Sequence, residues 1–538
     1  MTHTSLPDTS SDSLHRVQLD AQAADSCEAS LLSLPQPLLV GILDSAAEAG
    51  SEHLASAMLA CKALRQAGEA MPHKARLVLT SAKLQRARKA GHERQLMAWL
   101  SSKAQMWQQV VVQMVSQTDL RLLLVSLAAA GNGHLRKLQL DFVEEDDFEG
   151  GSEAELPGAE VCYRLPQELE LLTSLTALWI WEASQEVPGS HPASDLAIFS
   201  SLTALQSLAF EGFRRGPLPP EAFSSLQQLT SLVLVLYRLE QGGKEGEDMW
   251  DGQERLLGSE HLAMCTALRC LVLEGVEPSL SEQEALAAWQ RLEELKLSYP
   301  DSTGRADAGF WHALPQLPRL TRLAANGLVG QACEALSNSL PACSRLVSLQ
   351  LRDYPESMLP PLPATVTQLE VGAPSFDALP LLPSLRSLSL LSNERLPGWP
   401  GSTSALVELT KLSLSSCLLY EFPAPLATLP SLEFLDLSCT ELSDLPTMLA
   451  CAGSLRWLGL CYNFLSGVPT VLGGGAASRL EHLNLGDNYN LVVDDGGLAV
   501  LRSLTALTYL DLSRVAQGTE LVAADSDVLR KALFKPLQ

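Results

Sequence analysis

Basic side chains are scarce in this chain of 538 residues, which has 38 lysines and arginines against 62 aspartates and glutamates and a formal net charge of −24. Binding to a nucleic-acid backbone depends on clustered positive charge. The sequence therefore argues against DNA or RNA as the main ligand. Hydrophobic residues still make up 46% of the chain, which fits an ordered globular protein.

Long hydrophobic runs are also missing. The longest, Leu122 to Ala130, contains a serine, whereas a membrane-spanning helix needs about 20 apolar residues. Residues 1–29 are rich in Ser, Thr and Asp and lack the basic start and apolar block of a secretory signal. We expect a disordered tail there, no membrane partner, and an intracellular protein that is not secreted. It would be cytoplasmic, with the nucleus or cytoskeletal and axonemal assemblies as alternatives.

Motifs for catalysis and metal binding are absent as well. The sequence has no HExxH, no GxxxxGK[ST], no GxSxG and no dinucleotide fingerprint. Its eleven cysteines form no CxxC pair and have no histidine at metal-ligand spacing. We therefore expect these cysteines to pack as small buried hydrophobic residues. We expect no enzyme activity, no catalytic residue, no cofactor and no metal, although a triad assembled from distant residues leaves no such motif.

The sequence does contain a repeat. A leucine (once a valine) is followed three positions later by leucine and five positions later by another apolar residue. From Leu385 to Leu480 the successive steps are 24, 23, 23 and 25 residues, and a weaker unit precedes the series near Trp107. The units begin at Leu135, Leu175, Leu205, Leu229, Leu268, Leu292, Leu320, Leu346, Val366, Leu385, Leu409, Leu432, Leu455, Leu480 and Leu507.

This spacing predicts stacked short strands. Positions three and five after the first leucine differ by two, so both side chains face one side of a strand. A single unit cannot bury that face and must stack on its neighbours. The pattern resembles the leucine-rich repeat family, best in Phe422 to Pro446. The resemblance implies an α/β leucine-rich-repeat solenoid over residues 96–514, with about 15–16 units and a curved parallel sheet on the concave face.

The family usually has Asn, Cys or Thr eight places after the first leucine, where the side chain bonds the backbone of adjacent turns. Five successive units place Asn393, Cys417, Thr440, Asn463 and Asn488 there. Buried backbone groups at a bend need such partners. Upstream the same place holds Val143, Phe213, Tyr237, Pro300 and Leu328, so we expect a less regular N-terminal half.

Two longer steps between units imply insertions, near residues 144–160 and 240–254. Both are acidic and glycine-rich, which is typical of solvated loops. A basic partner is the alternative explanation for their charge.

The open ends of a solenoid need covers. Residues 515–538, with a short apolar helix from Asp525 to Phe534, are expected to cap the C-terminal end. At the other end, residues 30–95 suggest amphipathic helices and a local basic interval from Lys74 to Arg94. That interval is a solvated face or a surface for an acidic partner.

Within this N-terminal segment, Leu31 to Gly68 resembles an F-box, the helical module that docks on the adaptor of cullin–RING ubiquitin ligases. A long loop at Ala46 to Glu52 and Gln36-Pro37 in place of the usual acidic stretch depart from the motif. The alternative is a plain helical cap for the repeats. The resemblance implies adaptor docking through Leu34, Pro35, Leu38, Leu39, Ile42 and Leu43.

The second, fourth and sixth positions after each first leucine should point onto the concave face. Exposed aromatic residues with polar neighbours make good interface anchors. Packing of some rings under an insertion or a cap is the alternative. The candidate binding residues are Trp179, Trp181, Arg322, Arg352, Phe434, Asp436, Trp457, His482, Tyr509 and Asp511.

The first functional hypothesis is a non-catalytic substrate-recognition subunit of a cullin–RING (SCF-type) ubiquitin ligase. Its partners would be the adaptor and a substrate protein held on the concave face, and the chain by itself would be a monomer. The second hypothesis is a structural or signalling scaffold, for example on cytoskeletal or axonemal assemblies, with no ligase link. A repeat scaffold fixes the shape of its surface and leaves the partner's identity open.

Overall fold

The computed structural model describes much of the repeat region and little of the chain's ends. The described residues are 75–80, 107–113, 117–129, 135–142, 165–182, 191–215, 219, 221–237, 256–262, 264–299, 308–352, 354, 361–372, 382–391, 406–446, 449, 451 and 453–515. Several predictions lie outside them: the tail 1–29, the six F-box-like residues Leu34, Pro35, Leu38, Leu39, Ile42 and Leu43, both acidic insertions, Asn393 and the helix Asp525 to Phe534.

The chain divides into two compact units, Met1–Leu232 with Leu236–Glu245 and Val233–Val235 with Gly246–Gln538. The first contains β1 (Ala75–Thr80), β2 (Trp107–Gln113), α7 (Gln117–Ala129), β3 (Lys137–Phe142), η2 (Gln167–Leu171), β4 (Ala177–Glu182), β5 (His191–Pro192), η3 (Ala193–Ser201), β6 (Ser207–Arg215), α8 (Glu221–Ser224) and the start of β7 (Ser231–Tyr237). Strands β1, β2, β3, β4 and β6 pair in that order, all in parallel, and β5 pairs with the end of β6.

The second unit continues the same construction with shorter strands. In chain order it contains β8 (Leu256–Gly258), α9 (Ser259–Leu262), β9 (Cys270–Glu274), β10 (Glu277–Ser279), α10 (Glu282–Ala288), β11 (Glu294–Ser298), η5 (Ala308–Gln316), β12 (Arg322–Asn326), α11 (Gly330–Ser339), η6 (Leu340–Ala342), β13 (Ser348–Leu351), β14 (Gln368–Gly372), β15 (Ser387–Leu391), β16 (Lys411–Ser413), η9 (Ala424–Thr428), β17 (Phe434–Asp436), β18 (Trp457–Gly459), η10 (Thr470–Leu472), β19 (His482–Asn484), α12 (Asp495–Ser503) and β20 (Tyr509–Asp511).

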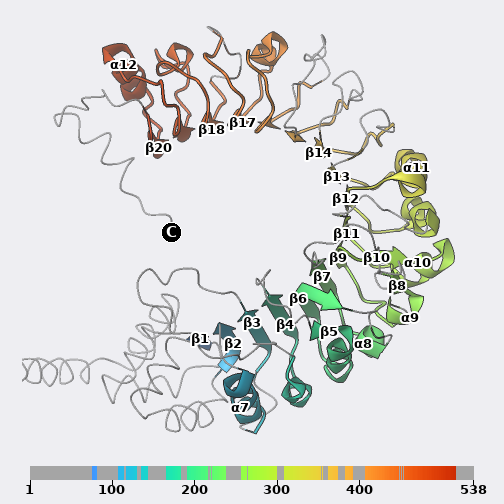
Figure 1. Cartoon of the computed structure of the whole chain (residues 1–538). Coiled ribbons are helices and arrows are strands. Elements are labelled where there is room, and N and C mark those ends of the chain that lie inside the picture. The colour runs from blue at the N-terminus through green and yellow to red at the C-terminus, as the bar shows by residue number, and fades with distance from the viewer. Residues whose placement is uncertain are drawn as a thin grey trace, which may run out of the picture. The chain divides into compact units, whose positions relative to one another are not determined.

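Strands β9 and β11 to β20 of the second unit belong to one parallel sheet. β9 pairs with β11, and β11 to β20 then pair in chain order. β8 and β10 make a separate parallel pair. Figure 1 shows the main strands along the inner, concave side of an arc and helices α10, α11 and α12 on the outer side. The chain therefore returns along the convex side where these three helices lie.

The repeated leucines are the core. In both units the leucine three places after each unit's start is buried, from Leu138 (0% exposed) to Leu510 (2%). The side chains five places after the start are buried as well, as are the unit-starting residues except Leu507, which is half-buried. In the second unit the ladder pairings align the third-position leucines directly across strands, for example Leu435 with Leu458 and Leu458 with Leu483. The described chain is therefore a leucine-rich-repeat solenoid of the α/β class, and this part of the prediction is confirmed.

The sheet of the first unit begins inside the range 30–95, where we expect helices. β1 lies there and pairs in parallel with β2, with Leu77 opposite Val110 and Leu79 opposite Val112. Its sequence, ARLVLT, contains a short apolar run with β-branched Val78, a pattern that is compatible with a strand. The expected helical range 30–95 extended beyond the F-box-like segment Leu31 to Gly68 and so included this strand.

Buried amides hold the bends after the C-terminal strands. Asn463 donates from Nδ2 to the carbonyls of Leu437 (2.7 Å) and Leu460 (3.1 Å), and its Oδ1 accepts from the backbone N–H groups of Thr440 (3.2 Å) and Leu442 (2.9 Å). Asn488 bonds the next bend in the same way. Thr440 and Cys417 occupy the equivalent place and are fully buried, and Cys417 Sγ donates to the Leu390 carbonyl at 3.4 Å.

The residue before each of these side chains has a left-handed backbone, and so does Arg514 in the same place of the last repeat. The φ angles of Ser416, Cys439, Tyr462, Asp487 and Arg514 lie between 52° and 64°. This conformation costs a non-glycine residue on the order of 1 kcal/mol. In return, each N–H from the first four reaches a carbonyl of the next unit, as in Cys439 to Cys461 at 2.9 Å. The bend therefore links neighbouring units at its edge while the leucines link them inside.

Among the described helices, none is long and apolar enough to cross a membrane.

We expect Asn463→Ala to lower the free energy of unfolding by about 3 kcal/mol, because it leaves several buried backbone groups without partners. Urea denaturation followed by circular dichroism measures the change. Asn490→Ala is the matched control, since Asn490 is an exposed asparagine in the following unit, and it should shift stability by less than about 0.5 kcal/mol. A loss as small as the control's would show that the amide does not hold the bend.

Candidate functional site

Four ring-bearing side chains stack on the concave face of the second unit. They occupy the second place in four consecutive repeats, and the strand pairings set Phe434 beside Trp457, Trp457 beside His482 and His482 beside Tyr509. Successive ring centroids are 4.1, 5.0 and 4.0 Å apart, with interplanar angles of 12°, 22° and 10°. Each such contact contributes about 0.5–1.5 kcal/mol beyond area burial. We call these four residues the ring ladder.

Stacking determines which part of the ring ladder a partner can reach. The facing surfaces of neighbouring rings cover one another, so the edges are left toward solvent. Phe434, Trp457 and His482 are half-buried, and Tyr509 at the end of the series is 36% exposed. The ladder is therefore a ridge of ring edges that crosses four strands, about 14 Å long at the usual strand spacing.

The ring ladder is electrically neutral at pH 7. Burial lowers the pKa of His482 from its ordinary value of 6.5, although the nearby Asp511 charge opposes the shift. Its Nδ1 is buried without a hydrogen-bond partner among the described residues. Burial, and then Asp511, raises the pKa of Tyr509. Both rings therefore stay in their uncharged forms near neutrality.

Two carboxylates and an amide run alongside the ring ladder. Asp436, Asn484 and Asp511 occupy the fourth place of their repeats, two residues after the rings of the same strands. Each Oδ1 accepts the backbone N–H two residues ahead, at 3.1, 3.0 and 2.9 Å respectively. These local bonds fix the side chains before any partner arrives.

Gly459 completes this column, and our sequence reasoning did not identify it as a site residue. A Cβ at this position would lie 2.5 Å from Cη2 of Trp457 and 2.6 Å from Oδ1 of Asp436. The glycine therefore leaves room for the indole to lie over its own strand while stacking with both neighbours. The signal was available as a glycine in the fourth place, where the adjacent repeats have Asp436 and Asn484.

The predicted cations Arg322 and Arg352 are placed on the concave face but are paired. Arg322 Nη2 lies 2.6 Å from Oε2 of Glu294, and Arg352 Nη2 lies 2.6 Å from Oε1 of Glu370. The hydrogen bond to Glu294 is the main cause of the raised pKa of Arg322. These pairs largely cancel the positive charge of the two arginines, because each carboxylate sits on the adjacent strand.

The remaining candidates, Trp179 and Trp181, lie on β4 in the first unit. Trp179 is half-buried, whereas Trp181 is 41% exposed and stands in register with Glu211 of β6. They form a pair on one strand and do not continue as a column, because the equivalent residues on β6 are Ala209 and Glu211.

Other chemistry is sparse in the described part. No group of three or more His, Cys, Asp or Glu side chains there is placed to hold a metal ion. Burial raises the pKa of Cys265 to about 12 and the pKa values of Cys343 and Cys451 to about 11, so these thiols stay protonated. They pack as the small hydrophobes that we expected.

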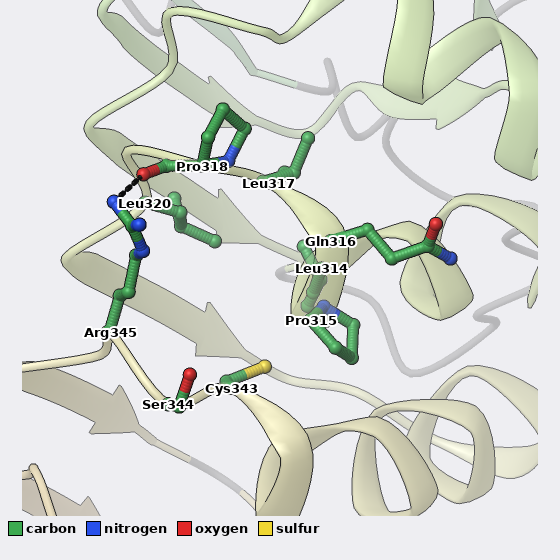
Figure 2. Close-up of a pocket in the computed structure, with 9 residues that line it drawn as sticks. All are labelled: Leu314, Pro315, Gln316, Leu317, Pro318, Leu320, Cys343, Ser344 and Arg345. Carbon is green, nitrogen blue, oxygen red and sulfur yellow. Dashed lines mark hydrogen bonds between the residues drawn. The ribbon is translucent and has the colours of Figure 1, made fainter.

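A cavity of about 200 Å³ lies beside the turns that precede β12 and β13, and Figure 2 shows the residues that line it. Arg345 closes one side by donating a hydrogen bond to the Pro318 carbonyl. Pockets for small molecules usually measure about 300–1,000 Å³, so we assign no ligand to it. It is lined by Leu314, Pro315, Gln316, Leu317, Pro318, Leu320, Cys343, Ser344 and Arg345.

No protein-family model and no curated protein matches the chain. Among solved structures, it is similar to a leucine-rich repeat protein of Leptospira interrogans (21% identity, TM-score 0.40), with 69% of this chain and 92% of that one covered. The chain is also similar to an internalin of Listeria monocytogenes (20% identity, TM-score 0.34), with 65% of this chain and 84% of that one covered. A third similar structure is TLR13 in its complex with ssRNA13 (19% identity, TM-score 0.38), with 76% of this chain and 58% of that one covered. The fold assignment rests on the buried leucines described above.

We expect Gly459→Ala to displace the indole of Trp457 and break its stacking with Phe434 and His482, because the added methyl overlaps the ring. Near-ultraviolet circular dichroism detects the loss, with Trp457→Phe defining the part of the signal that belongs to this indole. Gly453→Ala is the control, since its Cβ would meet nothing nearer than 3.9 Å. Identical spectra for the two alanine variants would contradict the packing described here.

Proposed function

We propose that the chain is a non-catalytic protein-binding solenoid that holds a partner protein on its concave face. The observation that carries this proposal is the ring ladder, a fixed ridge of aromatic edges beside preorganised polar groups. Aromatic residues with polar neighbours are enriched among the anchors of protein interfaces. Because the ladder is already stacked, binding would cost little side-chain entropy.

The ring ladder is the main anchor, and Trp181 is a secondary one. The ladder presents four adjacent rings, whereas Trp181 lies on a strand with a single ring partner nearby in sequence, Trp179. Arg322 and Arg352 contribute through their shape and hydrogen bonding more than through charge, since exposed ion pairs such as theirs add only about 0–1 kcal/mol.

The biological setting we propose is a cullin–RING ubiquitin ligase, in which the chain recognises the substrate. The support is the F-box-like pattern of Leu34-Pro35 with Leu38, Leu39, Ile42 and Leu43, placed before leucine-rich repeats. These residues lie outside the described part, so the proposal rests on sequence alone. A scaffold without a ligase link is the alternative setting for the same concave face.

We expect Trp457→Ala to weaken binding of a purified partner by on the order of 2 kcal/mol, or about thirtyfold in Kd, while leaving the fold intact. The partner is first isolated from native cells and then titrated by calorimetry. Phe464→Ala is the control, because Phe464 is 55% exposed on the loop after β18 and not part of the ladder. If Trp457→Ala instead melts the protein, the indole is a core residue and the proposed anchor is wrong.

We expect a pull-down with the full chain to recover the ligase adaptor, and the double change Leu38→Asp with Ile42→Asp to abolish recovery. Charged side chains would disrupt the apolar contacts by which an F-box docks. Trp457→Ala in parallel should lose substrate and keep the adaptor. Recovery that survives the double change, or recovery of cytoskeletal proteins without the adaptor, would favour the scaffold.

A further inference from the structure

The charge pattern beside the ring ladder indicates the chemistry of its partner. The last four repeats present their second, fourth and sixth places on the concave face, and the structure describes all of these residues. Among them, Asp436 and Asp511 are the only side chains with a formal charge. Neither forms an ion pair with a lysine or arginine of the described residues. In the middle of the same sheet, Glu294 in the second place and Glu370 in the fourth place of their repeats are paired with arginines. The C-terminal part of the concave face thus keeps two unneutralised carboxylates.

Both carboxylates are held in place without neutralisation. Asp436 Oδ1 accepts from the backbone N–H and the hydroxyl of Ser438, at 3.1 and 2.6 Å. Asp511 Oδ1 accepts from the N–H of Ser513 at 2.9 Å. The second oxygen of each aspartate makes no further hydrogen bond among the described residues. Each acid is therefore oriented by its own turn and still able to accept from a partner.

The spacing of the two acids follows from the sheet register. Asp436 pairs with Gly459, Gly459 with Asn484, and Asn484 with Asp511. Three strand steps at about 4.8 Å each put the acids about 14 Å apart. A peptide that crosses the strands in extended form rises about 3.3 Å per residue, so four residues cover almost the same distance. Residues i and i+4 of such a peptide also point to the same side.

The ring ladder suits the stems of basic side chains. Inside the ladder the ring faces are covered by neighbouring rings, so a cation can reach only the ring edges and the outer faces of the two end rings, Phe434 and Tyr509. The apolar edges can still pack against the methylene stems of lysine or arginine, whose charged heads prefer to remain solvated or paired. Guanidinium groups pair well with carboxylates because they donate two parallel hydrogen bonds. The formal charge of −24 on the whole chain further favours the approach of a basic partner.

We propose that the C-terminal concave face binds an extended basic segment of a partner protein, with arginine or lysine at positions i and i+4 pairing with Asp436 and Asp511 and their stems lying across the ring ladder. This deepens, and rests on, the proposed function of the concave face. It states that the segment bound at this face is basic. It also states that the two carboxylates select the spacing between the basic residues of that segment.

The test uses fluorescein-labelled peptides of about ten residues, in a Ser/Thr background, with arginines at i and i+4 or at i and i+3. Anisotropy with the full chain gives the Kd. We expect the i,i+4 peptide to bind about tenfold more tightly, because in the i,i+3 peptide the two arginines point to opposite sides. A peptide with glutamates in place of both arginines should not bind.

Variants of the acids locate the binding site. Asp436→Asn and Asp511→Asn keep the oxygen that bonds the turn and remove only the charge. Each should weaken the i,i+4 peptide about tenfold and reduce its preference over the i,i+3 peptide. Asp444→Asn removes the same charge from an exposed aspartate in the segment between β17 and β18, outside the strands. The affinity of this variant for the i,i+4 peptide should match that of the parent chain.

The outcomes separate this inference from the proposed function. Equal weakening in all three asparagine variants, or equal affinity for the two arginine spacings, overturns the inference, because charge alone would then explain binding. A native partner that is lost with Trp457→Ala but kept by both Asp436→Asn and Asp511→Asn also overturns it, while the protein-binding role of the ring ladder stands. Loss of that partner in all three of these variants, with Asp444→Asn unaffected, supports both.

Discussion

Burial of the third- and fifth-place side chains of each repeat is the constraint on which the rest of the structure depends. One repeat has too little apolar surface to fold alone, so every strand must align its leucines with those of the next strand. The register of Leu435 with Leu458 and of Leu458 with Leu483 follows from this. The same register also determines which side chains lie on the concave face, because shifting a strand by one residue would exchange its buried and exposed side chains. The stacked rings of the ladder are thus a consequence of the leucine register.

The bends are a second, independent constraint, and they explain why the C-terminal repeats are the regular ones. After β18 the buried Asn463 donates to carbonyls of two adjacent turns at once, and after β17 the Thr440 hydroxyl bonds the Leu437 carbonyl and the Asn463 side chain. Where the same place holds Leu328, no side-chain hydrogen bond is possible, and the neighbouring repeats use helix α11 and the aromatic contacts of Trp289 with Phe310 on the convex side. The strands before and after these bends pair in register, which places the second-place side chains of β17 to β20 in one column.

The sequence was sufficient for the periodic features and insufficient for the local ones. Leucine spacing predicted the strands and the core, and the second-place column predicted that Phe434, Trp457, His482 and Tyr509 would be neighbours. The pairing of Arg322 with Glu294 was missed because the two residues are 28 positions apart and become adjacent only in the folded register. Strand β1 was missed because a short apolar run such as Leu77-Val78-Leu79 fits a strand and a helix equally well. Gly459 was missed because it matters by having no side chain, and this becomes evident only from the position of the Trp457 indole beside it.

These features also explain why overall charge and local charge have different roles on this surface. The excess of acids over the whole chain is a long-range field that speeds approach of basic proteins and is weakened by salt beyond about 10 Å. It cannot distinguish one basic segment from another. Discrimination needs charges that are few, fixed and spaced, and the turn bonds of Asp436 and Asp511 hold two carboxylates at a separation set by the sheet itself. Because burial keeps His482 neutral between them, no positive charge on the ladder competes with that of a partner near pH 7.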